Sequence, residues 1–468
     1  MDEWGNHVLK VGSLPNYNAE CPSNDSEAID TEQINQNDEL INQYRKDVEP
    51  WLSSLFQSEH LSLLVGSGFT TAIAQKCRCQ SLDMGYDANW FPQSYRNVLD
   101  KHLKENANIT RSCKPNIEDQ IRILSQSIDG LIALGEKGKA VEFELSLNEL
   151  LKHFYKRLLD TEAGIRSNMG KEHDINPLNT IVPFLMSFAS RAASRERLNL
   201  FTTNYDRLIE LGCDFSGIRI IDRFIGALEP VFRSSRLDVD MHYSPPGIRG
   251  EPRYLEGVVR LTKLHGSLDW RYDKELKVIR RIGIGFGAVQ PSDPIFNDES
   301  QRIMIYPNPM KDRETAEYPY VELFRDLAAA ICRPNSTLVT YGYGFGDDHI
   351  NRAITDMLTI PSTHLLIISY NKADNRIPAF FDKQKNTNQI SLMIGSHFGN
   401  ITTLVANYLP RPSYDSLTIR MADLKNKRTA NGDKESKNTT HLSNQIGTGN
   451  ALNKLSTTER NTDVDIPF

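Results

Sequence analysis

Two short segments of the sequence carry side chains that could take part in proton transfer. The segment "LHGS" contains His265, and histidine is a candidate general base at neutral pH because the ordinary pKa of its imidazole is about 6.5. The segment "TTNYD" contains Asn204 and Asp206, whose amide and carboxylate can orient a water molecule or hold a polar ligand. Each segment also has an ordinary interpretation, because Asn204 and Asp206 can cap the helix predicted after them and His265 can be a loop residue.

Two glycine-rich segments could bind phosphate. The glycines of "GSGFT" (66–70) and "GYGFG" (342–346) would let backbone N–H groups approach phosphate oxygens, and a helix that starts after them adds a favourable potential. The first segment differs from the dinucleotide fingerprint GxGxxG, because Thr71 occupies the position of the third glycine. The sequence has no GxxxxGK motif followed by Ser or Thr, so it does not predict an ATP-binding P-loop.

Continuous apolar runs precede all four segments. The runs "LSLLV", "LNLF", "LTKL" and "TLVTY" lie directly before them, and "HLLIISYNK" and "QISLMIGS" are further candidate strands. Short apolar runs with polar or glycine-containing ends are typical of strands buried on both faces. Helical patterns separate the runs, as in "DDHINRAITDML", where Asp347 and Asp348 suit a helix N-terminus. The sequence therefore predicts an α/β, Rossmann-like fold: a mostly parallel sheet with helices on both faces and the four polar segments at its carboxyl edge.

Periodicity and composition divide the rest of the chain. Residues 95–175 are predicted to form an inserted helical subdomain, because apolar residues recur every three or four positions in stretches such as "NIEDQIRILSQSIDGLI". Residues 1–40 and 411–468 are rich in polar residues, so both are predicted to be tails and the second to be disordered. The alternative for either tail is a short helix that docks on a partner. The main domain is expected over residues 41–410.

Composition excludes several classes of protein. The chain has 468 residues, of which 39% are hydrophobic, and its formal net charge of -6 gives no general attraction to nucleic acid. No window approaches the roughly 18 apolar residues that a membrane helix needs, and we see no export signal at the N-terminus. The six cysteines are scattered along the chain, which suits reduced thiols and predicts a cytoplasmic protein.

In this order, the four segments resemble the motifs of the sirtuins, and in particular those of the sirtuin-like domains of bacterial antiviral defence systems. Sirtuins begin with a glycine turn, here "GSG", continue with a Thr-x-Asn-x-Asp segment, here "TTNYD", and carry their catalytic histidine in the dipeptide "HG". The later segment "YGYGFGDDHIN" is similar to that of the defence branch. The resemblance covers about residues 45–410 and implies that the chain uses NAD.

The resemblance also implies a role for individual residues. His265 would be the general base toward a ribose hydroxyl or water, Asn204 would orient ribose or the water, and Asp206 would hold the carboxamide of nicotinamide. The residues expected to bind NAD are Gly66, Ser67, Gly68, Phe69, Thr70, Thr203, Tyr205, Gly342, Tyr343, Gly344, Phe345 and Asn371. Tyr343 and Phe345 have core packing as their alternative. No metal is expected.

Two departures from the sirtuin pattern bear on the reaction. Deacylating sirtuins have a "PDFR"-type segment after the glycine turn and two Cys-x-x-Cys pairs for zinc, whereas this chain has "FTTAIAQKCRCQ", with Cys77 and Cys79 as its only close pair. Without an acyl substrate, water would attack NAD, so the expected activity is that of an NAD glycohydrolase that releases nicotinamide and ADP-ribose. A non-catalytic sensor of NAD or ADP-ribose and an NAD-dependent protein deacylase are the alternatives.

The same resemblance implies a biological context and a partner. Sirtuin-like NADases of defence systems deplete NAD, so their activity has to be restrained, and the companion protein is often a HerA-type hexameric ATPase. We therefore expect an NAD-depleting effector of antiphage defence that forms a homo-oligomer and docks on such an ATPase. Contact with nucleic acid would be indirect, and no contact with membranes is expected.

Overall fold

The computed structural model describes residues 4–12, 14–22, 31–82, 85–109, 115–172, 174–191, 195–234, 239–243, 253–273, 275–288, 302–304 and 318–411. The chain divides into two units, Met1–Pro412 and Ser413–Phe468. The second unit lies outside the described residues, and with it all but the first residue of the predicted disordered tail at 411–468.

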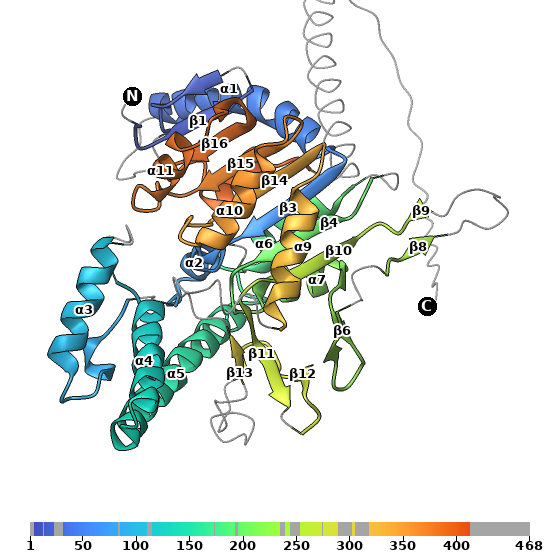
Figure 1. Cartoon of the computed structure of the whole chain (residues 1–468). Coiled ribbons are helices and arrows are strands. Elements are labelled where there is room, and N and C mark those ends of the chain that lie inside the picture. Colours follow the sequence, from blue (N-terminus) through green and yellow to red (C-terminus); the bar gives the residue numbers. More distant parts are fainter. Residues whose placement is uncertain are drawn as a thin grey trace, which may run out of the picture. The chain divides into compact units, whose positions relative to one another are not determined.

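A nine-stranded sheet forms the centre of the first unit (Figure 1). Its spatial order is β2-β1-β16-β15-β14-β3-β4-β10-β5, and every pair from β16 to β5 is parallel. The strands are β1 (Val8–Val11), β2 (Leu14–Asn16), β3 (His60–Val65), β4 (Leu198–Thr202), β5 (Arg219–Ile221), β10 (Val258–Lys263), β14 (Ser336–Tyr341), β15 (His364–Ser369) and β16 (Ile390–Ile394). The predicted mostly parallel, Rossmann-like sheet is thereby confirmed.

The order of the strands reverses next to β3. After β1 and β2, the chain enters the parallel part of the sheet at β3 and continues to β4, β5 and β10 on one side, then crosses over to β14, β15 and β16 on the other side. The carboxyl ends of β3 and β14 therefore flank the topological switch point, which is where open α/β sheets bind their ligands.

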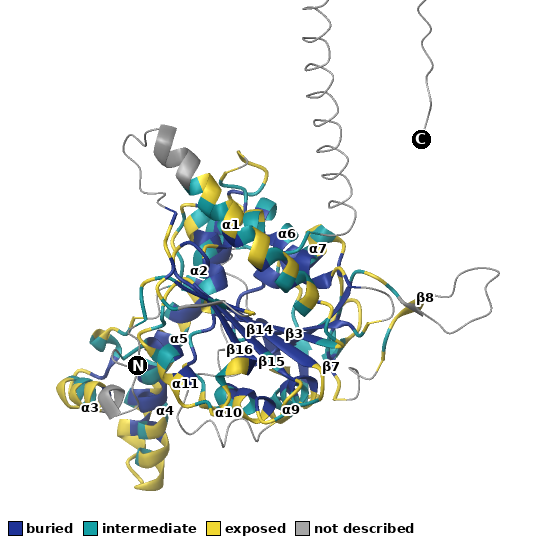
Figure 2. Ribbon diagram, turned by 90° about the horizontal axis from the view of Figure 1, so that it is seen from above, coloured by how far each residue is buried: buried dark blue, intermediate teal, exposed yellow. Residues whose placement is uncertain are grey.

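Helices cover both faces of the sheet (Figure 2). One face carries α1 (Thr31–Leu55), α2 (Ser67–Lys76), α6 (Leu178–Ala189) and α7 (Leu208–Ser216), and the other carries α9 (Tyr320–Ile331), α10 (Asp348–Met357) and α11 (Arg376–Asp382). Helix α12 (Ile401–Asn407) packs into the same core as α1 and α6. Successive residues of β3 serve the two cores: Leu63 belongs to the first and Leu64 to the second, and both are fully buried. Burial on both faces explains why these strands are continuous apolar runs.

Three helices form a separate packed region between the end of α2 and α6. They are α3 (Arg96–Ile109), α4 (Ile117–Ala133) and α5 (Lys137–Arg166), at the lower left of Figure 1. A capping box between Asn116 and Asp119 starts α4, because each side chain accepts from the backbone N–H of the other residue. Apolar stripes on α4 and α5 meet in a core of their own that includes Leu124 and Phe154.

The N-terminal segment differs from the tail expected over residues 1–40. Within that range β1 pairs antiparallel with β16 and β2 pairs with β1, and α1 begins at Thr31. Val8 is fully buried and Leu9 nearly so, although the strand is only four residues long and includes Lys10. This segment is ordered because it pairs with the edge strand β16, and its own composition does not predict that pairing.

A second, five-stranded sheet was not predicted. Its order is β13-β11-β12-β7-β6, and its pairs are antiparallel. The strands are β6 (Phe224–Ile225), β7 (Val231–Phe232), β11 (Gly266–Asp273), β12 (Val278–Arg281) and β13 (Arg302–Met304), and a separate pair is formed by β8 (His242–Tyr243) and β9 (Arg253–Tyr254). Because β11 starts directly after His265, this sheet shares one loop with the carboxyl edge of the main sheet.

Across the described ranges, no helix is long and apolar enough to cross a bilayer.

Candidate active site at the carboxyl edge of the sheet

Glycines at the ends of β3 and β14 bring two backbones into direct contact at the switch point. Gly66 N donates to Tyr341 O and Gly68 N donates to Gly342 O, each at 3.0 Å. A Cβ atom on Gly66 would lie 2.5 Å from Gly342 O, and a Cβ atom on Gly342 would lie 2.8 Å from Gly68 Cα. Gly342 also has a φ of +61°, which disfavours other residues. The close backbone approach itself therefore requires these glycines, and we call this contact between Gly66, Gly68 and Gly342 the glycine crossing.

A buried hydrogen-bond network lies beside the glycine crossing, where β4 ends. Asn204 Nδ2 donates to Gly66 O at 3.0 Å and to Thr70 Oγ1 at 3.1 Å. Thr70 Oγ1 donates to Asp206 Oδ2 at 2.7 Å, and Asp206 Oδ1 accepts from Leu208 N at 3.1 Å. The side chains of Thr70, Asn204 and Asp206 are all buried, and we call them the Thr70 network. This network joins two predicted site segments that lie 134 residues apart in the sequence.

The hydrogen bonds of the Thr70 network assign the atoms of Asn204. The atom that faces the carbonyl oxygen of Gly66 must be the amide nitrogen, because a carbonyl oxygen can only accept. Its two hydrogens are directed at Gly66 and Thr70, which leaves Oδ1 as the atom through which Asn204 could act on a ligand. The bond from Leu208 N to Asp206 shows that this carboxylate also stabilises the start of α7, which was the alternative interpretation of the residue.

His265 lies between β10 and β11, at the same edge of the sheet. Its side chain is almost fully buried, with 3% of the residue exposed, and its ring centroid is 6.1 Å from that of Tyr205. The next residue, Gly266, has a φ of +81°, a conformation that glycine adopts without steric cost. The glycine that follows His265 is thus explained by the left-handed backbone conformation needed where the chain passes from one sheet to the other.

Helix α5 of the helical region reaches the segment that follows β4. Glu162 is 1% exposed, and its carboxylate accepts from the backbone N of Arg207 at 2.9 Å and from the guanidinium of that residue at 2.6 Å. Two turns earlier on α5, Phe154 packs edge-on against Tyr205, with ring centroids 5.7 Å apart. The helical region therefore supports the site directly, a link that no local sequence pattern indicates.

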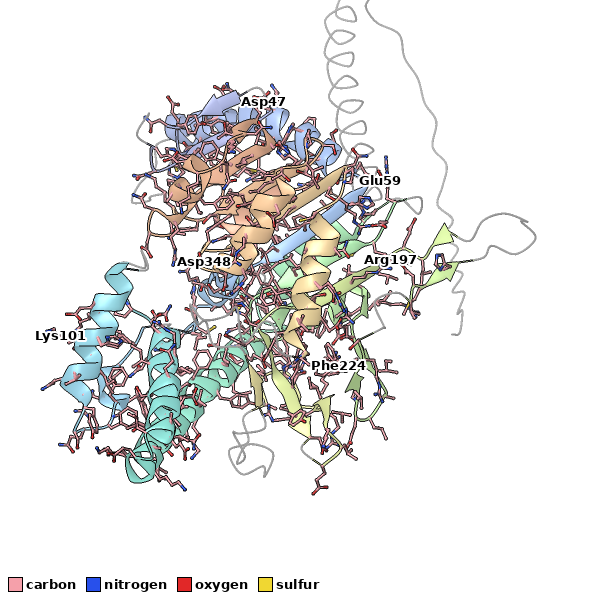
Figure 3. All side chains as sticks on the ribbon, viewed as in Figure 1. Asp47, Glu59, Lys101, Arg197, Phe224 and Asp348 are labelled. Atoms are coloured by element: carbon pink, nitrogen blue, oxygen red, sulfur yellow. The ribbon has the colours of Figure 1, made fainter. Side chains whose placement is uncertain are left out.

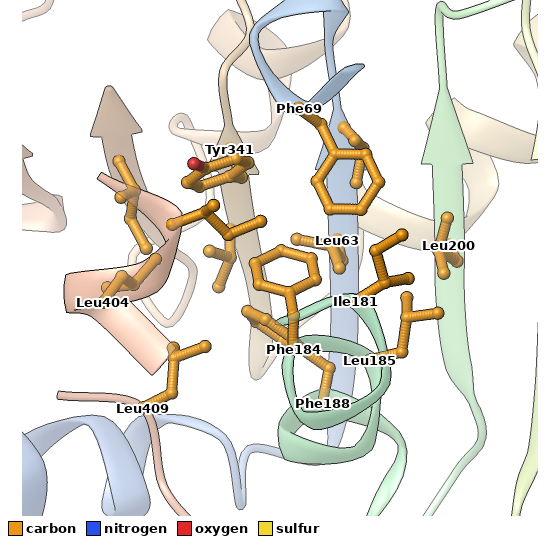
Figure 4. Close-up of a cluster of buried hydrophobic side chains, with 14 of the residues drawn as sticks. Leu63, Phe69, Ile181, Phe184, Leu185, Phe188, Leu200, Tyr341, Leu404 and Leu409 are labelled. Atoms are coloured by element: carbon orange, nitrogen blue, oxygen red, sulfur yellow. The ribbon is translucent and has the colours of Figure 1, made fainter. Parts of the chain in front are cut away.

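Three aromatic residues that were expected to bind NAD have their side chains in the core. Phe69 is fully buried and its ring centroid lies 5.2 Å from that of Phe184 (Figure 4). Tyr343 and Phe345 are 3% and 5% exposed and pack against each other at 4.9 Å. The turns after β3 and β14 direct these side chains toward the helices and the sheet, so the structure places the three side chains in the core.

The other expected residues are spread along the same edge. Ser67 is exposed at the start of α2, and Thr203 N donates to the carboxyl end of β3 at 3.2 Å. Gly344 lies in the turn after β14. Asn371 is exposed after β15, and its Oδ1 accepts at 2.9 Å from the backbone N–H two residues later, which closes an Asx turn.

Asp347 is a residue of the site that the sequence did not reveal. It was interpreted as a helix N-terminal residue and occupies the N-cap position of α10, but its side chain makes no capping hydrogen bond. Its Oδ2 lies instead 3.3 Å from Nε2 of His265. The following residue, Asp348, lies at the start of α10 and is labelled in Figure 3. Only the tertiary structure distinguishes the two neighbouring aspartates.

The site therefore combines an imidazole, an amide and two carboxylates with the backbone turn at the switch point. These groups can orient a polar ligand and can accept a proton from a hydroxyl or a water molecule. In the part of the chain that the structure describes, no group of three or more His, Cys, Asp and Glu side chains could hold a metal ion.

Comparison with known proteins agrees with this geometry. Residues 198–391 match the family model described as SIR2-like domain. The matched range begins with β4 and ends in β16, so it contains Asn204, Asp206, His265 and Asp347, whereas the glycine turn after β3 lies before it. No curated protein matched the chain. SIR2-like domains are NAD-dependent enzymes, and the range of this chain that is similar to them lies on the Rossmann-like sheet.

Proposed function

We propose that the chain is an NAD glycohydrolase, which cleaves NAD to nicotinamide and ADP-ribose. One observation carries the proposal: Asn204 and His265 come from adjacent parallel strands to the same edge of the sheet, next to the glycine crossing at the switch point. The pyrophosphate of NAD would lie at the turn that starts α2, where Ser67 and the helix N-terminus face outward.

Asn204 would orient the attacking water. Its amide nitrogen is bound to Gly66 O and Thr70 Oγ1, so its Oδ1 would accept a hydrogen bond from the water. A water that donates one hydrogen to Oδ1 directs an oxygen lone pair away from Asn204 and toward C1′ of the nicotinamide ribose. The remaining lone pairs of Asp206 would accept from the carboxamide of nicotinamide.

His265 would take the proton that the reaction releases. The water oxygen forms a bond to C1′ while the C1′–N bond breaks, and the bonding electron pair neutralises the pyridinium ring of the departing nicotinamide. The water proton passes to the imidazole and then to solvent. A protein deacylase would use the acyl oxygen of a substrate in place of this water, so the two activities differ in the nucleophile and in the need for an acyl peptide.

Product analysis tests this proposal. Purified chain incubated with NAD should release nicotinamide and ADP-ribose in equal amounts without any peptide, as measured by chromatography. His265→Ala and Asn204→Ala should each lower the rate by about 10²- to 10⁴-fold. His102→Ala, at an exposed position of α3, is the matched control and should leave the rate unchanged. Release of nicotinamide only with an acyl-lysine peptide would identify a deacylase, and NAD binding without turnover would identify a sensor.

We also propose that NAD depletion serves antiphage defence and that the chain acts as a homo-oligomer with a HerA-type ATPase. The resemblance of "YGYGFGDDHIN" to the defence branch supports this context. Docking would use the folded unit, since the polar segment 424–468 offers little apolar surface for a stable interface. Co-purification with an ATPase from the neighbouring gene should therefore survive deletion of residues 424–468, and loss of the ATPase on deletion would assign the docking to that segment.

A further inference from the structure

The turn between β14 and α10 directs a carboxylate at the imidazole of His265. Asp347 occupies the N-cap position of α10, where an aspartate side chain ordinarily accepts from the backbone N–H two or three residues later. It makes no such bond, and its Oδ2 lies 3.3 Å from Nε2 of His265. Both side chains are largely buried, at 4% exposure for His265 and 13% for Asp347, so water screens their interaction weakly.

The turn around Asp347 is held by its own hydrogen bonds. The one hydroxyl hydrogen of Tyr343 is shared between Asp347 O, 3.3 Å from Oη, and Asn351 Oδ1, 3.2 Å from Oη. Asn351 Nδ2 donates to Phe345 O at 3.0 Å, and Asn351 N donates to Asp347 O at 2.9 Å. Asn351 therefore binds both ends of the turn, and the position of the Asp347 carboxylate is set by the backbone that carries it.

One residue of this turn has an unfavourable backbone conformation. Phe345 has a φ of +52°, in the left-handed region that non-glycine residues rarely adopt. Its ring compensates by packing between Tyr343 and Phe380, with centroids 4.9 and 4.8 Å away. A left-handed residue at this point reverses the chain between β14 and α10 and brings Asp347 to face the β10–β11 loop, which carries His265.

From this geometry we propose that Asp347 is a positioning residue for His265. The two atoms are at ion-pair distance without the alignment of a hydrogen bond, and a small rotation of the imidazole would let the carboxylate accept from Nε2–H. Nδ1 would then carry the lone pair and become the basic nitrogen. The carboxylate would also stabilise the imidazolium that forms when His265 takes a proton. This inference rests on the proposed role of His265 in NAD cleavage, although the assigned tautomer can be observed without any reaction.

Two other described groups lie close to His265 in space or in sequence. The ring of Tyr205 packs against His265 from the β4–α7 segment, with 6.1 Å between centroids. Lys263, two residues before the histidine on β10, directs its ammonium group at the backbone oxygen of Asp206 and at Glu210, 3.0 Å from the carboxylate of Glu210. The ammonium is thus already paired with oxygens on the α7 side.

The pH dependence of NAD cleavage tests the proposal. Asp347→Asn keeps the shape of the side chain and removes its charge, and it should lower kcat/KM by about 10²-fold or more while KM changes by less than about threefold. The acidic limb of the kcat/KM profile should shift to lower pH by about 1 unit, because the carboxylate that favours the imidazolium is gone. Asp348→Asn removes the same charge one residue later and should leave both the rate and the profile unchanged.

Imidazole ¹⁵N NMR of the full chain provides a readout that does not depend on turnover. In wild type, the His265 signals, assigned by their loss in His265→Gln, should show a proton on Nε2 and none on Nδ1. In Asp347→Asn the two tautomers should mix. Unchanged tautomers together with an unchanged kcat/KM profile would overturn the proposal and make the contact a structural one. A wild-type chain that shows the Nε2–H tautomer but cleaves no NAD would refute the proposed function and leave the positioning role standing.

Discussion

Two neighbouring parts of the carboxyl edge are built in opposite ways. At the glycine crossing, backbone atoms of the turn after β3 meet backbone atoms at the end of β14, and a Cβ atom on Gly66, Gly68 or Gly342 would collide with them. In the Thr70 network, next to it on the same edge, buried side chains hold the turn after β3 to the segment after β4 by hydrogen bonds. The glycine crossing depends on the absence of side chains, whereas the Thr70 network depends on the hydrogen-bond donors and acceptors of its side chains.

The difference predicts how each part responds to substitution. A contact made by steric fit fails when atoms are added, because protein interiors are packed as densely as crystals. A buried polar network fails when one partner is removed, because the remaining groups lose the hydrogen bonds that compensated for their removal from water. The variants below separate the two cases, beginning with the largest expected effect.

Gly66→Ala should cause the largest loss of stability. Gly66 has an extended backbone, with φ of -102° and ψ of -175°, so alanine would be strained only by its contacts. Its Cβ would lie 2.5 Å from Gly342 O and 2.6 Å from Tyr343 Cα, and these backbone atoms cannot rotate away. We expect a decrease of about 3 kcal/mol in the free energy of unfolding, measured by chemical denaturation.

Gly138→Ala in α5 is the matched control for that substitution. A Cβ atom on Gly138 would meet no described atom within 4 Å, so alanine should leave stability unchanged or raise it by up to about 1 kcal/mol through helix propensity. If Gly66→Ala were within about 1 kcal/mol of wild type, the crossing would be adaptable and our description of it as a fixed steric contact would be wrong.

Thr70→Val should have an intermediate effect on stability and a selective effect on activity. Valine keeps the shape of threonine but removes the hydroxyl that accepts from Asn204 and donates to Asp206. The two unpaired groups should lower the free energy of unfolding by about 1–3 kcal/mol. NAD cleavage should slow at the same time, because the amide of Asn204 loses one of its two fixed partners.

Thr70→Ser separates the hydroxyl from the methyl group in the same experiment. Serine keeps the hydroxyl and should retain most of the NAD cleavage, as measured by nicotinamide release. Equal rates for the valine and serine variants would show that the hydroxyl of Thr70 does not orient Asn204.

Substitution of Cys79, beyond the C-terminal end of α2, should have the smallest effect on NAD cleavage. Cys77 and Cys79 lie just past that end, where a hydrogen bond from the Cys77 thiol lowers the pKa of Cys79 to about 7, while the same bond and burial raise the pKa of Cys77. Because the thiolate is the reactive form, Cys79 should be alkylated by iodoacetamide with a midpoint near pH 7, and Cys77 should stay unmodified in the folded chain.

Peptide mass spectrometry across a pH series measures these two reactions separately. Cys79→Ser should leave NAD cleavage within about twofold of wild type, because the residue lies at the opposite end of α2 from the glycine crossing. Alkylation of both cysteines at one rate, with a midpoint above about pH 8.5, would contradict the assigned hydrogen bond.

The strands that carry the site were predictable because the residues of each strand show by themselves that the strand is buried. A strand that is covered on both faces must be apolar at nearly every position, so "LSLLV", "LNLF" and "TLVTY" could be identified without knowledge of their neighbours. Parallel strands bring their carboxyl ends to one edge, and this rule predicts from the sequence that Asn204 and His265 lie near each other.

Elements stabilised by distant partners were missed. The strand β1 is four residues long, and its partner β16 lies near the other end of the folded unit, so its order depends on an edge that its own composition does not reveal. The small sheet that begins at Gly266 was missed for a related reason, because strands such as "VIRR" are short and highly charged and pair only within the folded chain.

The sequence by itself determined which residue types stand at the ends of the strands, and therefore the class of chemistry that this edge can support. Only the tertiary structure decided how each side chain is used: it directed Phe69 into the core, paired Glu162 with Arg207, and turned Asp347 toward His265. The reason is physical. Strand burial and helix starts depend on residues within a few positions, whereas the partner of a buried polar group is selected by packing between segments that the sequence keeps tens to hundreds of residues apart.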